Sequence, residues 1–346
     1  MLIDTADLIF DARSVTQLLY MYSAFEGRFS ADSTTLLWKG SEEDLLKASK
    51  LIKLPEQIII LDIISKDSVL VRDFHAIKKI KNGLSRVSVR SKKSYLCTSF
   101  ASGFYFEVIK SGLSIENNQV IQFDDGLSNE LIEANDKRVL RSLLYVINGI
   151  FLFPPKYRLF SDHRFKNIYT SINPDHIVED SSKVVVDISE RVSSTFFRIS
   201  KQHVNVISPK SALLMTTHSV ESKRTDKNEF QSVIGGVVKR LRGLGAQEVY
   251  LSKHPAEGYG NDEFYKSIGL ITCYEDFPSE LLVANKHITL VANPFNSTLI
   301  MCDYLKLLDH IKTVVSYWPA NAPYKSQRIK MIENLLDKYS ICHYII

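Results

Sequence analysis

The stretch "ALLMTTHSVESKRTDKNEFQSVIGGVVKRLRGLGAQEVYLS", residues 212–252, decides the fold. It opens with a short apolar run, "ALLMTT" (212–217), and closes with another, "EVYLS" (248–252), and each run is typical of a buried strand. Residues 226–245 lie between them and place apolar side chains at i, i+3, i+4, i+7, i+8 and i+11, which predicts one buried stripe along a helix. Asp226, with a glutamate three residues later, resembles a capping box. A strand, a helix and a strand in this order predict a βαβ unit with parallel strands.

The same alternation extends through the rest of the chain. Further strands are predicted at 57–64, 119–123, 183–188, 287–292 and 312–317. Further helices are predicted at 14–27, 41–53, 68–82, 128–147, 297–308 and 326–339. In the first of these helices, Ser14 is the expected N-cap and Gly27 the residue just past the end. The stretch from about 151 to 205 contains three prolines and is interpreted as an inter-domain region.

A chain of 346 residues with this pattern is expected to form two domains. The predicted fold class is α/β, with two Rossmann-like, doubly wound domains facing each other across a cleft. The first domain spans 1–190 and includes the inter-domain region from about 151. The second spans 191–325, and residues 326–346 form a helix that packs back on the first. Neither a GxGxxG nor a GxxxxGK[ST] pattern is present.

Composition narrows the function classes. Hydrophobic residues make up 45% and charged residues 24%, which excludes a disordered chain. The net charge of +4 is too small for a dedicated nucleic-acid surface, although it allows a weak attraction to anionic substrates or to a membrane surface. The four cysteines form no CxxC pair, which argues against a zinc site or a disulfide scaffold and favours the reducing cytosol. The N-terminal residues do not form a signal-peptide pattern, and no segment reaches the ~18 apolar residues of a membrane span.

Ligands of open α/β sheets bind outside the carboxyl ends of the strands, so residues at strand ends are candidates for a site. The first candidate is Asp124-Asp125-Gly126, directly after the strand at 119–123. A carboxylate there could act as a general base, and the glycine would let the backbone turn sharply. The alternative is a turn in which Asp125 caps the following helix.

Two further candidates lie in the second half. Lys253-His254-Pro255 follows the strand at 248–252; the histidine could donate a hydrogen bond to phosphate or a proton to a leaving group. The proline would hold His254 extended, and Lys253 adds positive charge. The alternative is an ordinary loop histidine.

Ser297-Thr298 opens a helix after the strand at 287–292. Free N–H groups and two hydroxyls at a helix N-terminus suit a phosphate, although simple capping by Asn296 or Ser297 is the alternative. Together the three segments offer a general base and groups that bind a phosphate, which suits the transfer of a group from a nucleotide to a hydroxyl.

In this order the three segments resemble the D/E-D-G, HP and S-S/T motifs of the bacterial GT-B-type sialyltransferases. These include the lipooligosaccharide sialyltransferases and the capsular polysialyltransferases. A fourth segment, "FPSELL" with Glu280, looks like the place where relatives hold the ribose hydroxyls of CMP; an ordinary helix start is the alternative. The resemblance covers most of the chain, but its motifs are short. Thr217, with Thr216 and His218 beside it, ends the strand at 212–217 and is either a further donor-binding residue or part of a loop.

The resemblance implies an inverting, metal-independent sialyltransferase without a cofactor. Asp124 would deprotonate a hydroxyl of a glycan or glycolipid acceptor, with Asp125, Gly126 and Pro255 in support, although Asp125 could be the base instead. CMP would leave from CMP-sialic acid, its phosphate held by His254, Lys253, Ser297 and Thr298, with Glu280 on its ribose.

The resemblance also implies a bacterial surface glycan as acceptor: lipooligosaccharide, O-antigen or capsule. The expected location is the cytoplasm, including peripheral association with the inner face of the inner membrane, and nucleic acid is not expected as a partner. Three alternatives stay open: a transferase of another CMP-activated acidic sugar (Kdo, pseudaminic or legionaminic acid), a non-catalytic glycan- or nucleotide-binding protein on the same fold, and a sugar-phosphate epimerase of GT-B-like architecture.

Overall fold

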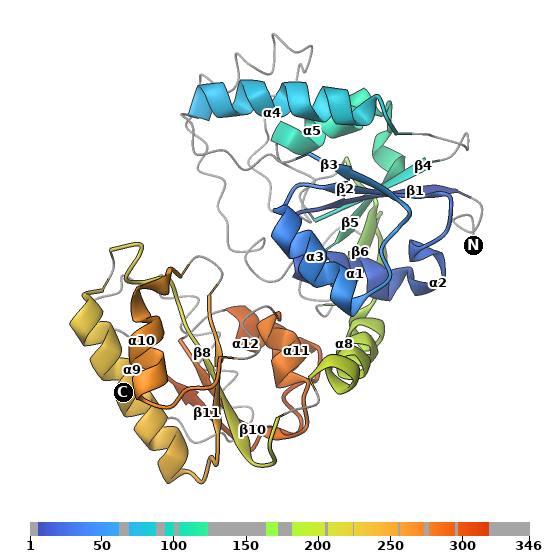
Figure 1. The fold of residues 1–346 in the computed structure, drawn as a ribbon. Coiled ribbons are helices and arrows are strands. Elements are labelled where there is room, and N and C mark those ends of the chain that lie inside the picture. Colours follow the sequence, from blue (N-terminus) through green and yellow to red (C-terminus); the bar gives the residue numbers. More distant parts are fainter. Residues whose placement is uncertain are drawn as a thin grey trace. The chain divides into compact units, whose positions relative to one another are not determined.

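The protein is described from a computed structural model. The residues described are 6–61, 69–87, 94–99, 104–123, 164–171, 182–204, 207–223, 225–254, 257–272, 277–294 and 297–317. The chain divides into two compact units, Met1–Val192 and Ser193–Ile346. Each unit is built around its own parallel sheet (Figure 1).

The first unit contains a seven-stranded sheet in the order β3-β2-β1-β4-β5-β6-β7, and all six neighbouring pairs are parallel. Its strands are β1 (Asp7–Ala12), β2 (Thr34–Trp38), β3 (Gln57–Ile60), β4 (Ser94–Thr98), β5 (Val120–Phe123), β6 (Asn167–Thr170) and β7 (Val184–Asp187). Its helices are α1 (Val15–Ala24), α2 (Glu26–Phe29), α3 (Glu42–Leu51), α4 (Val69–Leu84), α5 (Phe104–Gly112) and the short η1 (Asn117–Gln119). Helices α4 and α5 cover one face of this sheet, and α1 and α3 cover the other (Figure 1). The strand order reverses between β1 and β4, as in a doubly wound sheet.

The second unit contains a four-stranded parallel sheet in the order β11-β10-β8-β9, which a single bridge between Tyr250 and Ile271 extends beyond β9. Its strands are β8 (Ser211–Met215), β9 (Val249–Ser252), β10 (Ile288–Asn293) and β11 (Thr313–Ser316). Its helices are α9 (Lys227–Gly243), η4 (Tyr259–Asn261), α10 (Asp262–Ser267), α11 (Ser279–Val283) and α12 (Ser297–Tyr304). Helix α8 (Ser189–His203) crosses from the first unit into the second.

The βαβ unit predicted at residues 212–252 is confirmed. Strand β8, helix α9 and strand β9 follow one another, and the two strands pair in parallel. The Asp226 side chain caps α9 by accepting from the backbone N–H groups of Asn228 and Glu229. Five of the six residues of the predicted stripe are buried in the core of the unit, and the sixth, Val233, is partly buried and packs against this core.

The α/β fold class with two Rossmann-like domains is therefore confirmed, although several boundaries differ. The region 151–205 is not irregular throughout: its described residues form β6 and β7 of the first sheet, and then α8. Strand β7 lies within the strand predicted at 183–188 and pairs with β6. Strand β6 was not predicted, because it is only four residues long and is recognised by its pairing with β5 rather than by its composition.

Gly27 is not the residue that directly follows the first helix, as the sequence predicted. Helix α1 ends at Ala24, because Phe25 leaves the helical conformation and places its ring against Phe10, Phe123 and Tyr169. Gly27 then falls inside α2. The helix predicted at 297–308 also ends early, at Tyr304, and Lys306 adopts a positive φ of 54° in the turn that follows. The helices predicted at 128–147 and 326–339 lie outside the described residues.

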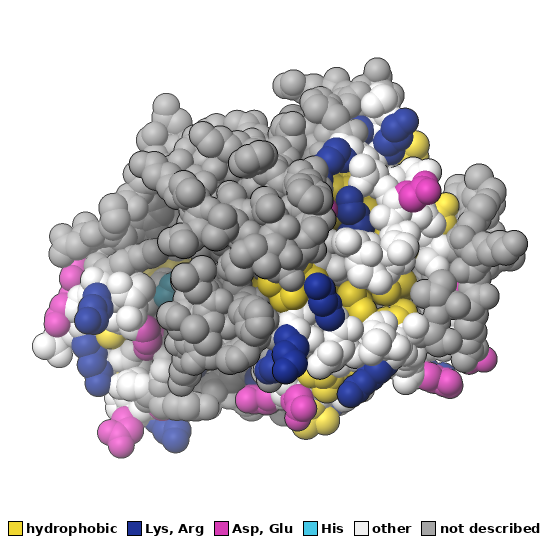
Figure 2. All heavy atoms as spheres, turned by 90° about the horizontal axis from the view of Figure 1, so that it is seen from above, with side chains coloured by type: hydrophobic (Ala, Val, Ile, Leu, Met, Phe, Trp, Pro, Cys, Tyr) yellow, Lys and Arg dark blue, Asp and Glu magenta, His cyan; other side chains and the backbone are white. Residues whose placement is uncertain are grey.

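On the face drawn in Figure 2, the described lysine and arginine side chains are interspersed with acidic and apolar ones. No helix in the described part of the chain combines the length and the apolar character needed to cross a membrane.

Candidate functional site

The carboxyl edge of the second sheet brings several predicted residues together. Strand β8 lies between β9 and β10, so the strand order reverses at β8, and such a reversal is where ligands of open α/β sheets bind. Two hydrogen bonds fix this edge: Tyr317, just after β11, donates to the carbonyl of Met215, and the Asn293 amide donates to the sulfur of Met215 at 3.1 Å. The carboxyl ends of β8 and β10 and the residue after β11 are therefore tied to one another.

Two histidines meet at this edge. Met215 and Ser252 are paired in the β8–β9 register, and the chains continue from them to His218 and His254. The ring centroids of His218 and His254 are 4.4 Å apart, and the ring planes are inclined by 33°. The Nδ1 atom of His218 is buried and has no hydrogen-bond partner among the described residues. A pair of imidazoles with an unused ring nitrogen is suited to a ligand that accepts hydrogen bonds.

The surroundings of His254 favour its neutral form. Burial lowers the pKa of His254, the nearby His218 lowers it further, and Glu221 acts in the opposite direction. A neutral imidazole near pH 7 can donate one N–H bond to an anion and take up a proton when negative charge arrives.

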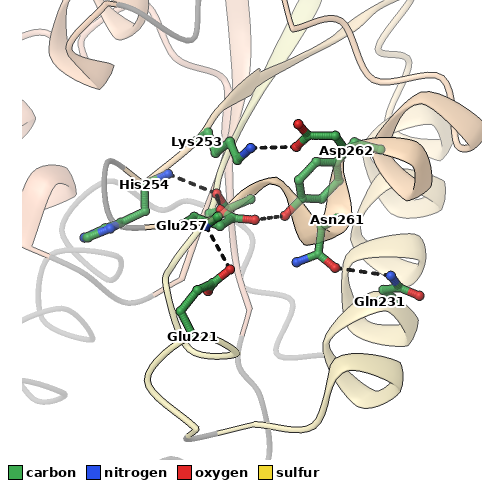
Figure 3. Close-up of polar contacts among 10 residues, drawn as sticks. Glu221, Gln231, Lys253, His254, Glu257, Asn261 and Asp262 are labelled. Atoms are coloured by element: carbon green, nitrogen blue, oxygen red, sulfur yellow. Dashed lines mark hydrogen bonds and ion pairs between the residues drawn. The ribbon is translucent and has the colours of Figure 1, made fainter. Parts of the chain in front are cut away.

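A buried carboxyl group lies just below His254. Glu257 is 8% exposed and accepts hydrogen bonds from the hydroxyls of Thr216 and Tyr265 (Figure 3). Burial raises the pKa of Glu257, while these two hydroxyls lower it. The Thr216 oxygen also accepts from the backbone N–H of His254 at 3.2 Å. This network escaped the sequence analysis because its members are far apart in the chain; Thr216 and Glu257, for example, are separated by 41 positions.

Lys253 and His254 point in opposite directions (Figure 3). The Lys253 ammonium lies 2.6 Å from a carboxylate oxygen of Asp262, and the lysine side chain is only 8% exposed. The predicted donor-binding residue Lys253 is thus engaged with Asp262 on the side of the strand away from the His254 ring.

Glu280 lies in the first turn of α11, beside α12. The hydroxyl of Ser279 before it contacts that of Ser252 at the end of β9, at 2.8 Å. Burial raises the pKa of Glu280, and this carboxyl in turn helps to raise the pKa of Cys302 in α12. A carboxyl group that is desolvated in this way gains from hydroxyl donors supplied by a ligand.

Ser297 is the first residue of α12, and Thr298 follows it. Both therefore lie at a helix N-terminus near the carboxyl end of β10, where backbone N–H groups attract anions. Thr217 follows β8 and is partly exposed, next to the histidine pair. These positions all lie at the carboxyl edge of the second sheet.

The other predicted residues cannot be placed. Strand β5 ends at Phe123, and Asp124, Asp125 and Gly126 lie outside the described residues, as does Pro255. Among the residues that are described, no group of three or more His, Cys, Asp or Glu side chains is arranged to hold a metal ion.

Comparison with known proteins identifies the fold. No protein-family model matches the chain, and no curated protein sequence matches it. Among solved structures, a UDP-GlcNAc 2-epimerase from Methanocaldococcus jannaschii aligns with a TM-score of 0.55 and 11% identity, over 98% of this chain and 88% of that one. The α/β-galactoside α-2,3-sialyltransferase of the luminous marine bacterium Photobacterium phosphoreum aligns with a TM-score of 0.54 and 12% identity, over 97% of each chain. CalG4, the calicheamicin glycosyltransferase, aligns with a TM-score of 0.53 and 9% identity, over 99% of this chain and 86% of that one. At these identities the likeness shows the fold alone: the chain has the two-domain Rossmann-like, GT-B-type fold shared by these enzymes.

Proposed function

We propose that this protein is an inverting, metal-independent glycosyltransferase that moves sialic acid from CMP-sialic acid to a hydroxyl of a bacterial surface glycan. The observation that carries the proposal is the His218–His254 pair at the reversal of the second sheet, with the N-terminus of α12 at the same edge. The motif order in the sequence supports a CMP-sugar. The fold, which epimerases and glycosyltransferases share, supports a nucleotide-sugar ligand in general.

In the proposed complex, the phosphate of CMP lies at His254, with His218 beside it and the backbone N–H groups at Ser297 and Thr298 completing the grip. The ribose hydroxyls donate to Glu280, whose carboxyl group is desolvated by burial and would gain from these hydrogen bonds. Thr217 lies at the same edge of the sheet, where it would also contact the CMP-sugar. Lys253 would reach the phosphate only after leaving Asp262.

The reaction is a direct displacement at the anomeric carbon. Asp124 accepts the proton of the acceptor hydroxyl, the hydroxyl oxygen bonds to the anomeric carbon, and the bond to the CMP oxygen breaks. His254 donates to the departing phosphate. A positioned acid or base typically contributes ~10²–10⁴-fold in rate. The proposed location is the cytoplasm, where CMP-sugar meets a glycan or glycolipid acceptor.

The test is a donor screen with the purified full chain. CMP-sialic acid, CMP-Kdo, CMP-pseudaminic acid, CMP-legionaminic acid and UDP-GlcNAc are each incubated with glycan acceptors, and release of CMP or UDP is measured together with the coupled product. The proposal expects product only from CMP-sialic acid, and loss of turnover by orders of magnitude in Asp124→Asn and His254→Asn. Conversion of UDP-GlcNAc to its C2 epimer would overturn it in favour of an epimerase, and CMP binding without turnover of any donor would favour a non-catalytic binding protein.

A further inference from the structure

The backbone of His254 is held from both sides by one small network. Its N–H donates to the Thr216 hydroxyl oxygen at 3.2 Å, and its carbonyl accepts from the backbone N–H of Glu257 at 2.8 Å. Thr216 itself is fixed to the neighbouring strand, because its backbone N–H donates to the carbonyl of Ser252 at 3.0 Å. His254 therefore depends on Thr216 and Glu257 for its position, although the hydrogen bonds described here reach its backbone and not its ring (Figure 3).

The Glu257 carboxylate decides which way the Thr216 hydroxyl points. A threonine hydroxyl has one proton and two lone pairs. Since Thr216 gives its proton to Oε2 of Glu257, a lone pair remains for the N–H of His254. The other carboxylate oxygen, Oε1, accepts from the hydroxyl of Tyr265, which is fully buried in α10. Each carboxylate oxygen of Glu257 therefore accepts a hydrogen bond from one hydroxyl group.

We propose that Glu257, acting through the Thr216 hydroxyl, is a positioning residue that fixes the backbone of His254 so that its imidazole faces the nucleotide phosphate. This inference rests on the proposed function, because it takes His254 as the residue that meets the phosphate. Glu257 does not itself contact the ligand. Its side chain is buried beneath the loop, and the imidazole of His254 extends away from it (Figure 3).

The count of donors and acceptors gives the inference a distinctive test. Glutamine offers one acceptor oxygen where glutamate offers two, so Glu257→Gln leaves one of the two hydroxyls without an acceptor. Removing the Tyr265 hydroxyl leaves the single amide oxygen to Thr216, while the amide NH2 group loses the Tyr265 oxygen as an acceptor. The double variant is therefore expected to regain the position of His254 without regaining stability. Thr216→Ser keeps the hydroxyl, and Thr216→Val removes it at nearly constant volume.

The experiment measures kcat and KM for the CMP-sugar reaction in Thr216→Val, Thr216→Ser, Glu257→Gln, Tyr265→Phe and the double variant Glu257→Gln/Tyr265→Phe. Circular dichroism and urea unfolding confirm that each variant is folded. Thr216→Val and Glu257→Gln are expected to lose about tenfold or more in kcat, since small displacements of a reacting group are costly. Thr216→Ser and Tyr265→Phe should stay within a few-fold of wild type, and the double variant should be more active than Glu257→Gln alone. Equal kcat for Thr216→Val and Thr216→Ser would overturn the inference.

A second readout needs no substrate. The titration of the His254 imidazole is followed by NMR in the ligand-free wild type and in the two Thr216 variants. The inference expects an altered His254 titration in Thr216→Val and an unaltered one in Thr216→Ser. If wild type turns over no CMP-sugar, the proposed function fails, while this titration still decides whether Thr216 positions His254. Identical titrations in both variants would refute the positioning role on its own.

Discussion

The imidazole rings of His218 and His254 lie 4.4 Å apart, measured between ring centroids, although 36 positions separate the two residues in the chain. The parallel pairing of β8 and β9 produces this proximity, because each ring follows the end of its strand by two or three residues. Two imidazoles so close together cannot both be charged at low cost, and burial adds to that cost for His254.

Nucleotide binding is therefore expected to take up protons. The pKa of His254 is lowered in the free protein, and a phosphate beside the ring favours the charged form and raises that pKa. Between the two pKa values the free protein carries less charge on His254 than the complex, so binding draws protons from the buffer. Calorimetric titration of CMP at pH 6.5 in two buffers of different ionisation enthalpy should show a heat that depends on the buffer.

The matched control is His287→Asn. His287 precedes β10, at the amino end of the sheet, and its Nδ1 contacts the carbonyl of Ile207 at 2.7 Å. This variant should keep the buffer dependence, whereas His254→Asn should lose most of it. A wild-type binding heat that is the same in both buffers would contradict the expectation.

The same lowered pKa makes stability depend on pH. His254 and His310 both have pKa values below the ordinary 6.5, chiefly because of burial. Below about pH 6.5 the unfolded state therefore binds more protons at these two histidines than the folded state does. As a result, the free energy of unfolding decreases as the pH falls below about 6.5. Urea unfolding midpoints should decrease from pH 7.5 to pH 5.5.

A double variant, His254→Asn/His310→Asn, isolates this contribution because asparagine does not titrate. Its midpoint should change less between the two pH values than that of wild type. Glu257 gives a pH dependence of the opposite sign, because a carboxyl group with a raised pKa favours the folded state only at pH values below that pKa. Glu257 is present in both the wild type and the double variant, so its contribution is the same in both. An equal pH dependence in both proteins would show that the two histidines do not carry it.

The sequence predicted the second unit better than the first, and the reason is physical. Strands β8 and β9 are apolar runs, and five of the six stripe positions of α9 are fully buried. Local pattern and tertiary packing agree there. Strand β1, "DLIFDA", escaped prediction because Asp7 and Asp11 suggest a solvated segment, whereas both are buried.

The candidate site could be predicted only in outline. Residues at strand ends are visible in a sequence, so His254 and the start of α12 could be found. What a sequence does not show is register and pairing at a distance: the contact between the two histidines needs the β8–β9 alignment, and the Thr216–Glu257 bond joins residues 41 positions apart.

Gly40 is expected to tolerate no side chain. A Cβ there would lie 2.5 Å from the carbonyl oxygen of Arg13 and 2.6 Å from the Trp38 ring. Gly40→Ala should lower the free energy of unfolding by about 1–3 kcal/mol through overpacking. Gly27→Ala is the control in the same unit: Gly27 lies in α2 with nothing within 4 Å of the added atom, so alanine should stabilise by roughly 0.5–1 kcal/mol. Urea unfolding monitored by tryptophan fluorescence compares the two, and equal effects would refute the steric explanation.

The first unit also contains a buried ion pair at its own strand reversal. The Lys39 ammonium lies 2.7 and 2.8 Å from the two carboxylate oxygens of Asp11, and the Thr98 hydroxyl donates to Asp11 at 2.9 Å. The Asp11 side chain is 0% exposed and that of Lys39 8%. Removing one partner of such a pair typically costs about 3–5 kcal/mol, because the other charge stays buried.

Lys39→Met is expected to cost more than Asp11→Asn. After loss of the lysine, a fully buried carboxylate keeps only the Thr98 hydroxyl among the partners described here. After loss of the carboxylate charge, the asparagine oxygen can still accept a hydrogen bond, and the Lys39 ammonium retains a little solvent. The double variant should lose less stability than the two single variants summed, since it contains no uncompensated charge. A double-mutant cycle of urea unfolding measures this coupling; additive losses, or a larger loss for Asp11→Asn, would mean that the ion pair does not stabilise this edge in the way its geometry indicates.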